Sequence, residues 1–305
     1  MRLFEKQADK TLLVITGPTA VGKTSLSIEV AQALNTEIVS ADARQFYREL
    51  KIGTATPTPA ELSIVRHHFV GNISIFDHYN VSQYEFEALE TINRLLETKN
   101  VVVLTGGSGL YIDAVCKGLD DLPPVDFEVR NHVEMVHRDQ GTEGLRSWLK
   151  NIDPEFYKVV DPANSNRLKR AIEVFLTTGR KFSELRTNTS KSRPFKIVKV
   201  VIEKPREQLF SDINKRVDLM VRAGLVEEAI GLFKHRNMNS LKTVGYRELF
   251  KWFSGDCTLN FAIEQIKTNT RRYAKRQLTW FKRYNDAVWM GEAKSENILE
   301  LIGKN

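Results

Sequence analysis

A short segment near the N-terminus has the residue types and spacing of a phosphate-binding loop. Residues 17–24 fit the pattern G-x-x-x-x-G-K-[ST], in which glycines let backbone N–H groups converge on phosphate oxygens. The first turn of a following helix would add partial positive charge. Lys23 could reach the outer phosphates, and the Thr24 hydroxyl could bind Mg²⁺. The residues expected to bind a di- or triphosphate are Gly17, Pro18, Thr19, Ala20, Val21, Gly22, Lys23 and Thr24.

A carboxylate follows the second expected strand. Asp42 comes two residues after Ser40, where that strand ends, so its side chain is expected at the carboxyl edge of the sheet. A carboxylate there could accept a proton, bind Mg²⁺ or hydrogen-bond a substrate amine. It could equally be a helix N-cap that satisfies backbone N–H groups. The position alone leaves both interpretations open.

A third strand lacks the acid that most P-loop NTPases carry. The apolar run at 101–105 continues into Gly106-Gly107-Ser108-Gly109, so no Asp stands at its end to help hold Mg²⁺. This pattern argues against ordinary ATP hydrolysis and favours a phosphate site with another use.

The elements that must position these groups alternate along the chain. Apolar runs bounded by glycine or polar residues predict buried strands at 11–17, 36–40, 101–105 and 195–202. Helices are expected at 23–34 and 82–99, the second beginning at a capping box of Ser82 and Glu85. Its inward side chains are expected to be Phe86, Leu89, Ile92 and Leu96. The alternation predicts an α/β fold with a P-loop NTPase-like parallel sheet.

The middle of the chain has helical patterns alone. They run from Asp126 to about Gly179 and are broken at Gly141, Pro154 and Pro162. We therefore expect a helical insert at 123–194 within a P-loop core of 1–122 and 195–305. Further helices are expected at 206–284, with breaks near 224, 237–243 and 255, followed by a short strand at 287–290.

Composition and charge narrow the class of protein. The 305 residues are 42% hydrophobic and carry a net charge of +7, with no apolar stretch long enough to span a bilayer and no signal-peptide pattern at the start. A cytoplasmic protein with two reduced thiols, Cys116 and Cys257, is expected. The segment 265–284 has seven basic residues and no acid: Lys267, Arg271, Arg272, Lys275, Arg276, Lys282 and Arg283.

That basic segment also has a helical stripe. The inward positions, at three-four spacing, are expected to be Ile266, Tyr273, Gln277, Trp280 and Tyr284, and pairs such as Arg271 and Lys275 are expected on outer faces. Basic charge interleaved with aromatic rings suits RNA. The alternative is a solvated helix face over core aromatics.

Six segments together resemble the tRNA dimethylallyltransferases. They read GPTAVGKT, SADARQFYR, IGTATP, GGSGLY, TVGYREL and RRYAKRQLTWFKR, and they occur in the family's order from about residue 12 to 290. The pattern is that of the bacterial type without a zinc finger. The chain departs from the family's usual residues at Val21, Ala43 and Ser108.

The resemblance implies transfer of a dimethylallyl group from dimethylallyl diphosphate to N6 of the adenine 3′ to the anticodon of tRNA. Asp42 matches the base, Ser108 a hydroxyl near it, and Lys23, with Mg²⁺ on Thr24, would stabilise the diphosphate. Arg216 matches an arginine that contacts the diphosphate, although an ordinary solvated helix face is its alternative. The residues that match tRNA contacts are Asp42, Ala43, Arg44, Gln45, Ser108, Arg130, Asn166, Arg167, Leu168, Lys169 and Arg170.

Three other functions compete with this one. A P-loop kinase of a nucleoside or small metabolite would share the phosphate loop and Asp42, and an adenylate isopentenyltransferase would share the chemistry. A P-loop RNA-binding regulator would need no base. The pair His67-His68 is expected to be structural or part of a substrate loop, because adjacent histidines point in different directions and no acid or Cys stands nearby at ligand spacing. A monomer is expected.

Overall fold

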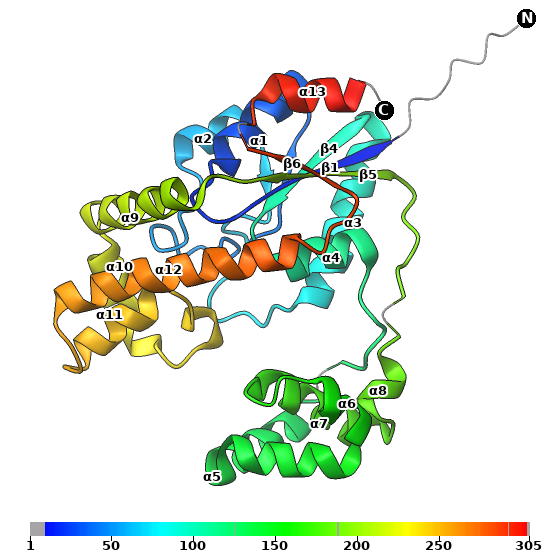
Figure 1. Cartoon of the computed structure of the whole chain (residues 1–305), viewed down its shortest axis with the longest axis vertical. Coiled ribbons are helices and arrows are strands. Elements are labelled where there is room, and N and C mark those ends of the chain that lie inside the picture. Colours follow the sequence, from blue (N-terminus) through cyan, green and yellow to red (C-terminus); the bar gives the residue numbers. More distant parts are fainter. Residues whose placement is uncertain (1–9, 125, 188, 292, 304–305) are drawn as a thin grey trace, which may run out of the picture. The chain divides into compact units, whose positions relative to one another are not determined.

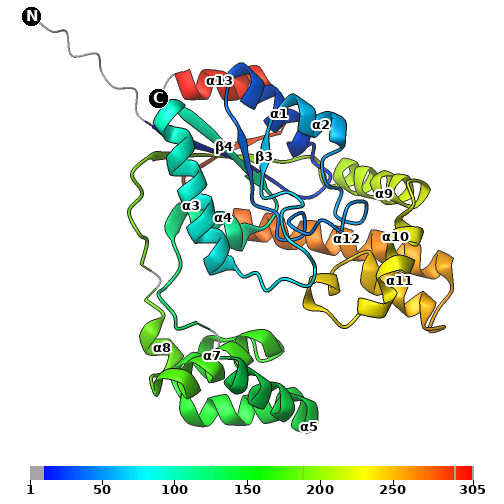
Figure 2. The same ribbon diagram turned by 180° about the vertical axis from the view of Figure 1, so that it is seen from behind.

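The computed structural model describes residues 10–124, 126–187, 189–291 and 293–303. The described residues form a six-stranded sheet whose strand pairs are all parallel, as predicted. Figures 1 and 2 show the sheet from opposite sides. The strand order across the sheet is β3 (His67–His68), β2 (Ile38–Ser40), β4 (Val101–Gly106), β1 (Thr11–Thr16), β5 (Lys196–Ile202) and β6 (Ala287–Met290).

Strand β1 shows why the sheet is covered on both faces. Leu12 and Val14 join one apolar cluster with α3 (Val81–Thr98) and α4 (Gly109–Lys117). Leu13 and Ile15 point the other way, into a cluster with helices α1 (Lys23–Ala33) and α13 (Ser295–Gly303). All four side chains are fully buried, so each contributes roughly 1.5–3 kcal/mol of hydrophobic stabilisation. Strands buried on both faces read as continuous apolar runs, which is why the sequence revealed them.

Helix α3 begins differently from the prediction. Its N-cap is Asn80, whose side chain accepts hydrogen bonds from the backbone N–H groups of Ser82 and Gln83 at 2.9 and 3.0 Å. The Gln83 side chain in turn accepts from the Asn80 N–H at 3.0 Å, which completes a capping box. The predicted box of Ser82 and Glu85 was therefore wrong by two positions. Asn followed by Gln satisfies the same free N–H groups as Ser followed by Glu.

The inward face of α3 also differs. Its buried residues are Tyr84, Ala88, Ile92, Leu95 and Leu96, whereas Phe86 is 72% exposed. The prediction of an inward Phe86 was wrong. Two residues along a helix correspond to about 200° of rotation, so a face centred on Tyr84 turns Phe86 toward solvent.

Four helices after β5 form a second core next to the sheet. They are α9 (Arg206–Arg222), α10 (Leu225–Leu232), α11 (Tyr246–Phe253) and α12 (Leu259–Phe281). Their shared cluster includes Val217, Leu225, Leu249 and Ile266. The breaks between them fall near the expected positions, and Gly224 at the start of α10 has φ 100°, a left-handed conformation that favours glycine.

The chain divides into two compact units. Residues Lys117–Ser192 form one, and the remaining described residues form the other. The first unit consists of α5 (Phe127–Ile152), α6 (Pro154–Val159), α7 (Ser165–Thr178) and α8 (Phe182–Leu185). It has its own buried cluster around Val133, Leu149 and Ile172, and α5 bends at Gly141, where φ is 65°. Among the helices described here, none is long and apolar enough to cross a membrane.

Candidate active site

The phosphate loop connects β1 to α1 (Lys23–Ala33), and its conformation depends on two glycines. A Cβ on Gly17 would lie 2.4 Å from the carbonyl oxygen of Ile202 on β5, so any other residue would clash with the neighbouring strand. Gly22, the N-cap of α1, has φ 101° in the left-handed region. The two glycines therefore permit the close approach to β5 and the left-handed turn before α1, a conformation in which a loop can present backbone N–H groups to an anion.

Two cationic side chains, Lys23 and Arg216, line one cavity together with three acids, Asp42, Glu61 and Asp212. Lys23 Nζ donates to the carbonyl oxygens of Gly17 and Pro18 at 2.9 and 2.7 Å. Burial and then the positive charge of Arg216 lower the pKa of Lys23 to about 7, while Asp42 opposes the shift. Burial also lowers the pKa of Arg216, and the negative charge of Asp42 again opposes this shift. Two cations held together at a cost in desolvation are typical of an anion site.

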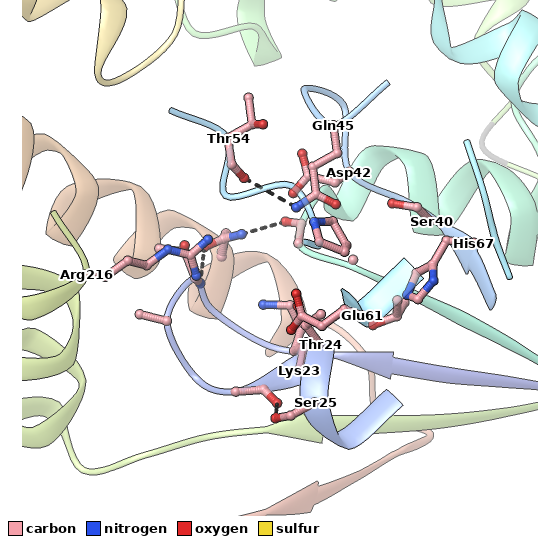
Figure 3. A pocket seen from close by; sticks show the side chains of 18 of the residues that line it. Lys23, Thr24, Ser25, Ser40, Asp42, Gln45, Thr54, Glu61, His67 and Arg216 are labelled. Atoms are coloured by element: carbon pink, nitrogen blue, oxygen red, sulfur yellow. Dashed lines mark hydrogen bonds between the residues drawn. The ribbon is translucent and has the colours of Figure 1, made fainter. Parts of the chain in front are cut away.

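The cavity has a volume of about 340 Å³ and brings together residues from distant parts of the sequence. Lys23 and Thr24 come from the start of α1, Asp42 follows β2, and Arg216 comes from α9 (Figure 3). The sequence had suggested each of these residues separately. The structure places Arg216 in the cavity wall, so its alternative as an ordinary solvated helix residue is wrong.

Asp42 lies in a turn at the carboxyl end of β2. Its Oδ1 accepts a hydrogen bond from the Arg44 N–H at 3.0 Å, and no helix follows. The helix N-cap alternative is therefore wrong, although the carboxylate does cap a turn. Ser108 lies beside it, since its Oγ accepts from the Ala43 N–H at 2.9 Å and its own N–H donates to the Ala41 carbonyl at 3.2 Å.

A second cavity of about 390 Å³ shares a wall with the first. Residues that line both are Thr19, Asp42, Thr54, Arg216 and Tyr273. The second cavity also has an apolar side formed by Val217, Met220, Leu225 and Ile266. Its polar side includes Arg44, Ser108, Lys242, Thr243, Arg247 and Arg276. Asp42 thus lies in the wall between the first cavity, which the phosphate loop lines, and a second cavity with a mixed apolar and polar lining.

Sequence reasoning missed the role of Gln277, which is 6% exposed on α12. Its Oε1 accepts from the Thr19 N–H at 2.9 Å, and its Nε2 donates to the Gly107 carbonyl at 2.8 Å. The side chain therefore connects the phosphate loop to the segment after β4. A Cβ on Gly107 would lie 2.3 Å from Nε2, so any other residue there would have to displace the Gln277 amide and its hydrogen bonds. The sequence did contain one indication of this role, because Gln277 places an amide in an otherwise apolar and aromatic inward stripe of the helix.

The basic face of α12 is smaller than the sequence indicated. Lys267 pairs with Asp218 at 2.8 Å and Glu264 at 2.9 Å, which raises its pKa. Arg271 is not an outer residue as predicted, because it is partly buried and donates to Asn214 Oδ1 at 2.6 Å. The exposed basic residues of this segment are Arg272, Lys275, Arg276, Lys282 and Arg283.

In the helical unit, two of the arginines expected to contact RNA share one buried acid. Glu173, which is 4% exposed, accepts from Arg130 Nε at 3.1 Å and lies 3.7 Å from Arg170 Nη1. Arg170 also donates to the Pro123 carbonyl at 2.7 Å. Both guanidinium groups therefore hold the unit together, whatever else they bind.

The remaining residues of that expected RNA segment differ in exposure. Asn166 and Arg167 are exposed, whereas Lys169 pairs with Glu134. Leu168 is fully buried in the core of the unit. The prediction that Leu168 contacts RNA is therefore wrong for its side chain, because helical spacing turns it inward when its neighbours face outward.

The two histidines lie on the edge strand β3 and have partners within the fold. His67 Nδ1 lies 2.8 Å from the Val65 carbonyl, and His68 Nε2 lies 2.6 Å from Glu37 Oε2. Across the described ranges, no group of three or more His, Cys, Asp or Glu side chains could hold a metal ion by itself. Mg²⁺ fits the first cavity in another way, since the Thr24 hydroxyl and the nearby carboxylates are hard oxygen donors that phosphate oxygens and water would complete.

Comparison with known proteins identifies the family. A model described as IPP transferase matches residues 45–284. The chain belongs to the IPP transferase family. A tRNA dimethylallyltransferase of Phocaeicola vulgatus is 47% identical over 292 residues, 96% of this chain and 97% of that protein. The chain is therefore an enzyme, which excludes the non-enzymatic RNA-binding regulator, and its family is not that of the metabolite kinases.

Solved structures of relatives share the fold of this chain. The crystal structure of a tRNA isopentenylpyrophosphate transferase from Bacillus halodurans has 34% identity and a TM-score of 0.71, over 97% of this chain and 95% of that one. A eukaryotic dimethylallyltransferase, captured acting on tRNA, has 25% identity and a TM-score of 0.75. The match covers 92% of this chain and 74% of that one. The P-loop-type α/β architecture is thus confirmed.

Proposed function

We propose that this enzyme transfers a dimethylallyl group from dimethylallyl diphosphate to N6 of the adenine 3′ to the anticodon of tRNA. The observation that carries the proposal is the position of Asp42, at the wall shared by a phosphate-binding cavity and a larger, partly apolar one. Relatives that are named for tRNA, and one that was crystallised acting on it, support the choice of acceptor.

The first cavity would hold the diphosphate of the donor. N–H groups of the phosphate loop, Lys23 and Arg216 would bind its oxygens, with the loop completed by Thr24. The bond between the allylic carbon and the diphosphate oxygen breaks, and its electron pair leaves with the diphosphate. Positive charge fixed in advance around the leaving group stabilises that developing charge. Mg²⁺ would supply further neutralisation of the diphosphate when bound.

The second cavity would hold the adenine and direct N6 to the allylic carbon. The new carbon–nitrogen bond forms as N6 loses a proton to Asp42, while Ser108 maintains the turn that carries this acid. N6 is a poor nucleophile because its lone pair is delocalised into the ring. Positioning of the reactants must therefore supply much of the reduction in the activation barrier, at most about 7–11 kcal/mol. The apolar wall around Met220 and Ile266 suits a flipped base or the allyl chain.

The rest of the tRNA would be bound mainly through its phosphates and sugars. The expected contacts near the site are Asp42, Ala43, Arg44, Gln45 and Ser108, and those in the helical unit are Arg130, Asn166, Arg167, Lys169 and Arg170. The polar side of the second cavity adds Arg276, which belongs to the basic segment noted in the sequence, and Lys242 and Arg247, which the sequence analysis had not included. We further propose that the enzyme acts as a cytoplasmic monomer.

One assay separates this function from an adenylate isopentenyltransferase. The chain is incubated with labelled dimethylallyl diphosphate and either unmodified tRNA or AMP. We expect label in tRNA alone. Label in AMP alone would overturn the choice of acceptor and leave the donor site intact.

Arg167 gives a test of RNA binding by the helical unit. Because it is exposed, Arg167→Ala should weaken tRNA binding without loss of fold, and one lost phosphate contact should reduce the slope of log K against log salt by roughly 0.7–0.9. Arg170 is a poorer choice, since its loss would leave Glu173 short of a partner. Lys181→Ala, at an exposed residue of the same unit outside the expected segment, is the control. An unchanged slope for Arg167→Ala would mean that this residue contacts no phosphate.

The pKa of Lys23 gives a test of diphosphate binding. A bound anion should raise this pKa from about 7, so binding should take up a proton above pH 7. The affinity contributed by Lys23 should be constant below pH 7 and fall by up to about tenfold per pH unit above it. Calorimetric titration with inorganic diphosphate from pH 6 to 9 measures this. Lys23→Ala is the control, because the ligand's own titration is common to both proteins; identical pH profiles would contradict the coupling.

A further inference from the structure

A carboxylate outside both cavities organises a loop that enters them. Glu228 lies on α10, and its Oε2 accepts from the backbone N–H groups of Lys51 and Ile52 at 3.0 and 2.8 Å. Its Oε1 accepts from the Gly53 N–H at 2.9 Å and from the Tyr246 hydroxyl at 2.7 Å. Each carboxylate oxygen thus accepts two hydrogen bonds. We call Glu228, the amides of 51–53 and Tyr246 the Glu228 cluster.

Tyr246 is also the surface on which this loop rests. It is fully buried at the start of α11, and a Cβ on Gly53 would lie 2.6 Å from its ring. Gly53 is therefore required for space, not for an unusual backbone conformation. The segments IGTATP and TVGYREL, nearly 200 residues apart in the chain, meet at this contact.

The far side of the loop forms part of the site. Thr54 lines both cavities, and Pro57 lines the first. The carbonyl oxygens of Thr54 and Ala55 accept from Gln45 Nε2 at 3.3 and 3.1 Å, and Gln45 lines the first cavity with Asp42 (Figure 3). Displacement of residues 51–53 would therefore move Thr54 and release Gln45.

We propose that Glu228 is a positioning residue for the transfer reaction. It fixes the 51–57 loop so that Thr54 and Gln45 shape the space in which the acceptor base meets Asp42. The inference rests on the proposed function, yet the cluster contains no residue that lines the first cavity next to the phosphate loop. Thr54 and Gln45, whose positions depend on the cluster, line the first cavity beside Asp42, whereas Lys23 and the phosphate loop belong to another segment. Loss of the cluster should therefore slow transfer much more than it weakens diphosphate binding.

The test is Glu228→Gln. This change replaces one carboxylate oxygen by an NH₂ group, which would face two donors, so two of the four hydrogen bonds are lost and the donors repel. Single-turnover transfer to tRNA should fall by roughly 10- to 100-fold, as for other small misplacements near a reacting centre. The affinity for inorganic diphosphate should fall much less than the transfer rate, and hydrogen exchange at the amides of 51–53 should become faster. Glu227→Gln, at the exposed neighbouring residue of α10, is the matched control and should behave as the unmodified chain does.

Tyr246→Phe keeps the ring against Gly53 and removes one hydrogen bond to Glu228, so the transfer rate should fall less than in Glu228→Gln. This second variant tests the proposal if Glu228→Gln fails to fold. Unchanged transfer in Glu228→Gln, despite faster exchange at 51–53, would overturn the positioning role. A parallel loss of diphosphate affinity and melting temperature in both variants would overturn it in favour of a general stabilising role. If the unmodified chain transferred nothing to tRNA, the proposed function would fail. Unchanged hydrogen exchange at the amides of 51–53 in Glu228→Gln would show that Glu228 does not hold this loop.

Discussion

Replacing Asp42 by Asn should slow single-turnover transfer by about 10²–10⁴, equivalent to roughly 3–5 kcal/mol in the barrier. Asn has nearly the same shape and can still accept the turn hydrogen bond from the Arg44 N–H, but it cannot take a proton. The melting temperature should therefore hardly change. Asp42→Ala loses that hydrogen bond as well, so its free energy of unfolding should be lower by about 1 kcal/mol.

The charge of Asp42 complicates this experiment. Asp42 raises the pKa of Lys23, so its removal also favours neutral Lys23. Rates should therefore be measured at pH 6 with saturating donor, where the bound diphosphate keeps Lys23 charged. Asp77→Asn is a matched control, because Asp77 is exposed and accepts a similar turn hydrogen bond, from the Ser74 N–H at 2.7 Å. A fast Asp42→Asn enzyme together with an unstable Asp42→Ala enzyme would leave Asp42 as a turn cap alone.

Replacing Lys23 by Ala should lower the transfer rate by about 10²–10³ and weaken diphosphate binding, the usual effect of removing one donor from a preorganised anion site. The loss of two hydrogen bonds to loop carbonyls is offset by relief of the repulsion with Arg216, so stability should change little. Affinity for tRNA without the donor should be retained, because Lys23 lines only the first cavity.

Lys215→Ala provides the control for charge. Lys215 precedes Arg216 on α9 but is exposed, so its removal changes the net charge equally without touching the cavity. Diphosphate affinity should then equal that of the unmodified chain. A fall in tRNA affinity parallel to the fall in rate in Lys23→Ala would show that the phosphate loop binds RNA instead of the donor.

Features encoded in short windows of sequence could be predicted. The glycine-rich loop with Lys23 and Thr24, and the buried strands β1, β4 and β5, depend on local backbone conformation and on apolar runs. The rule that ligands bind at the carboxyl ends of parallel strands then placed Asp42 beside the loop. The short strand at Ala287–Met290 was predicted with the boundaries observed. By contrast, the edge strand β3 has two residues, too few for any periodicity.

Features that depend on which side chains meet across the fold could not be predicted from the sequence. Gln277 reaches Thr19 across 258 positions, and Glu228 reaches the 51–53 amides across about 175, so no local pattern marks either residue. The same applies to Arg271 and Arg170, which look like free surface charges in the sequence but have polar partners within the fold.

The sequence by itself determined the phosphate loop, the parallel α/β core and the acid at its edge, because each follows from local geometry and the periodicity of one element. Only the tertiary structure decided that α9 and α12 close a second cavity against Asp42, and which basic residues remain exposed for RNA. The physical reason is that burial and pairing are properties of contacts between elements. The sequence around a charged, amide or aromatic side chain does not indicate which distant residue will contact that side chain in the folded protein.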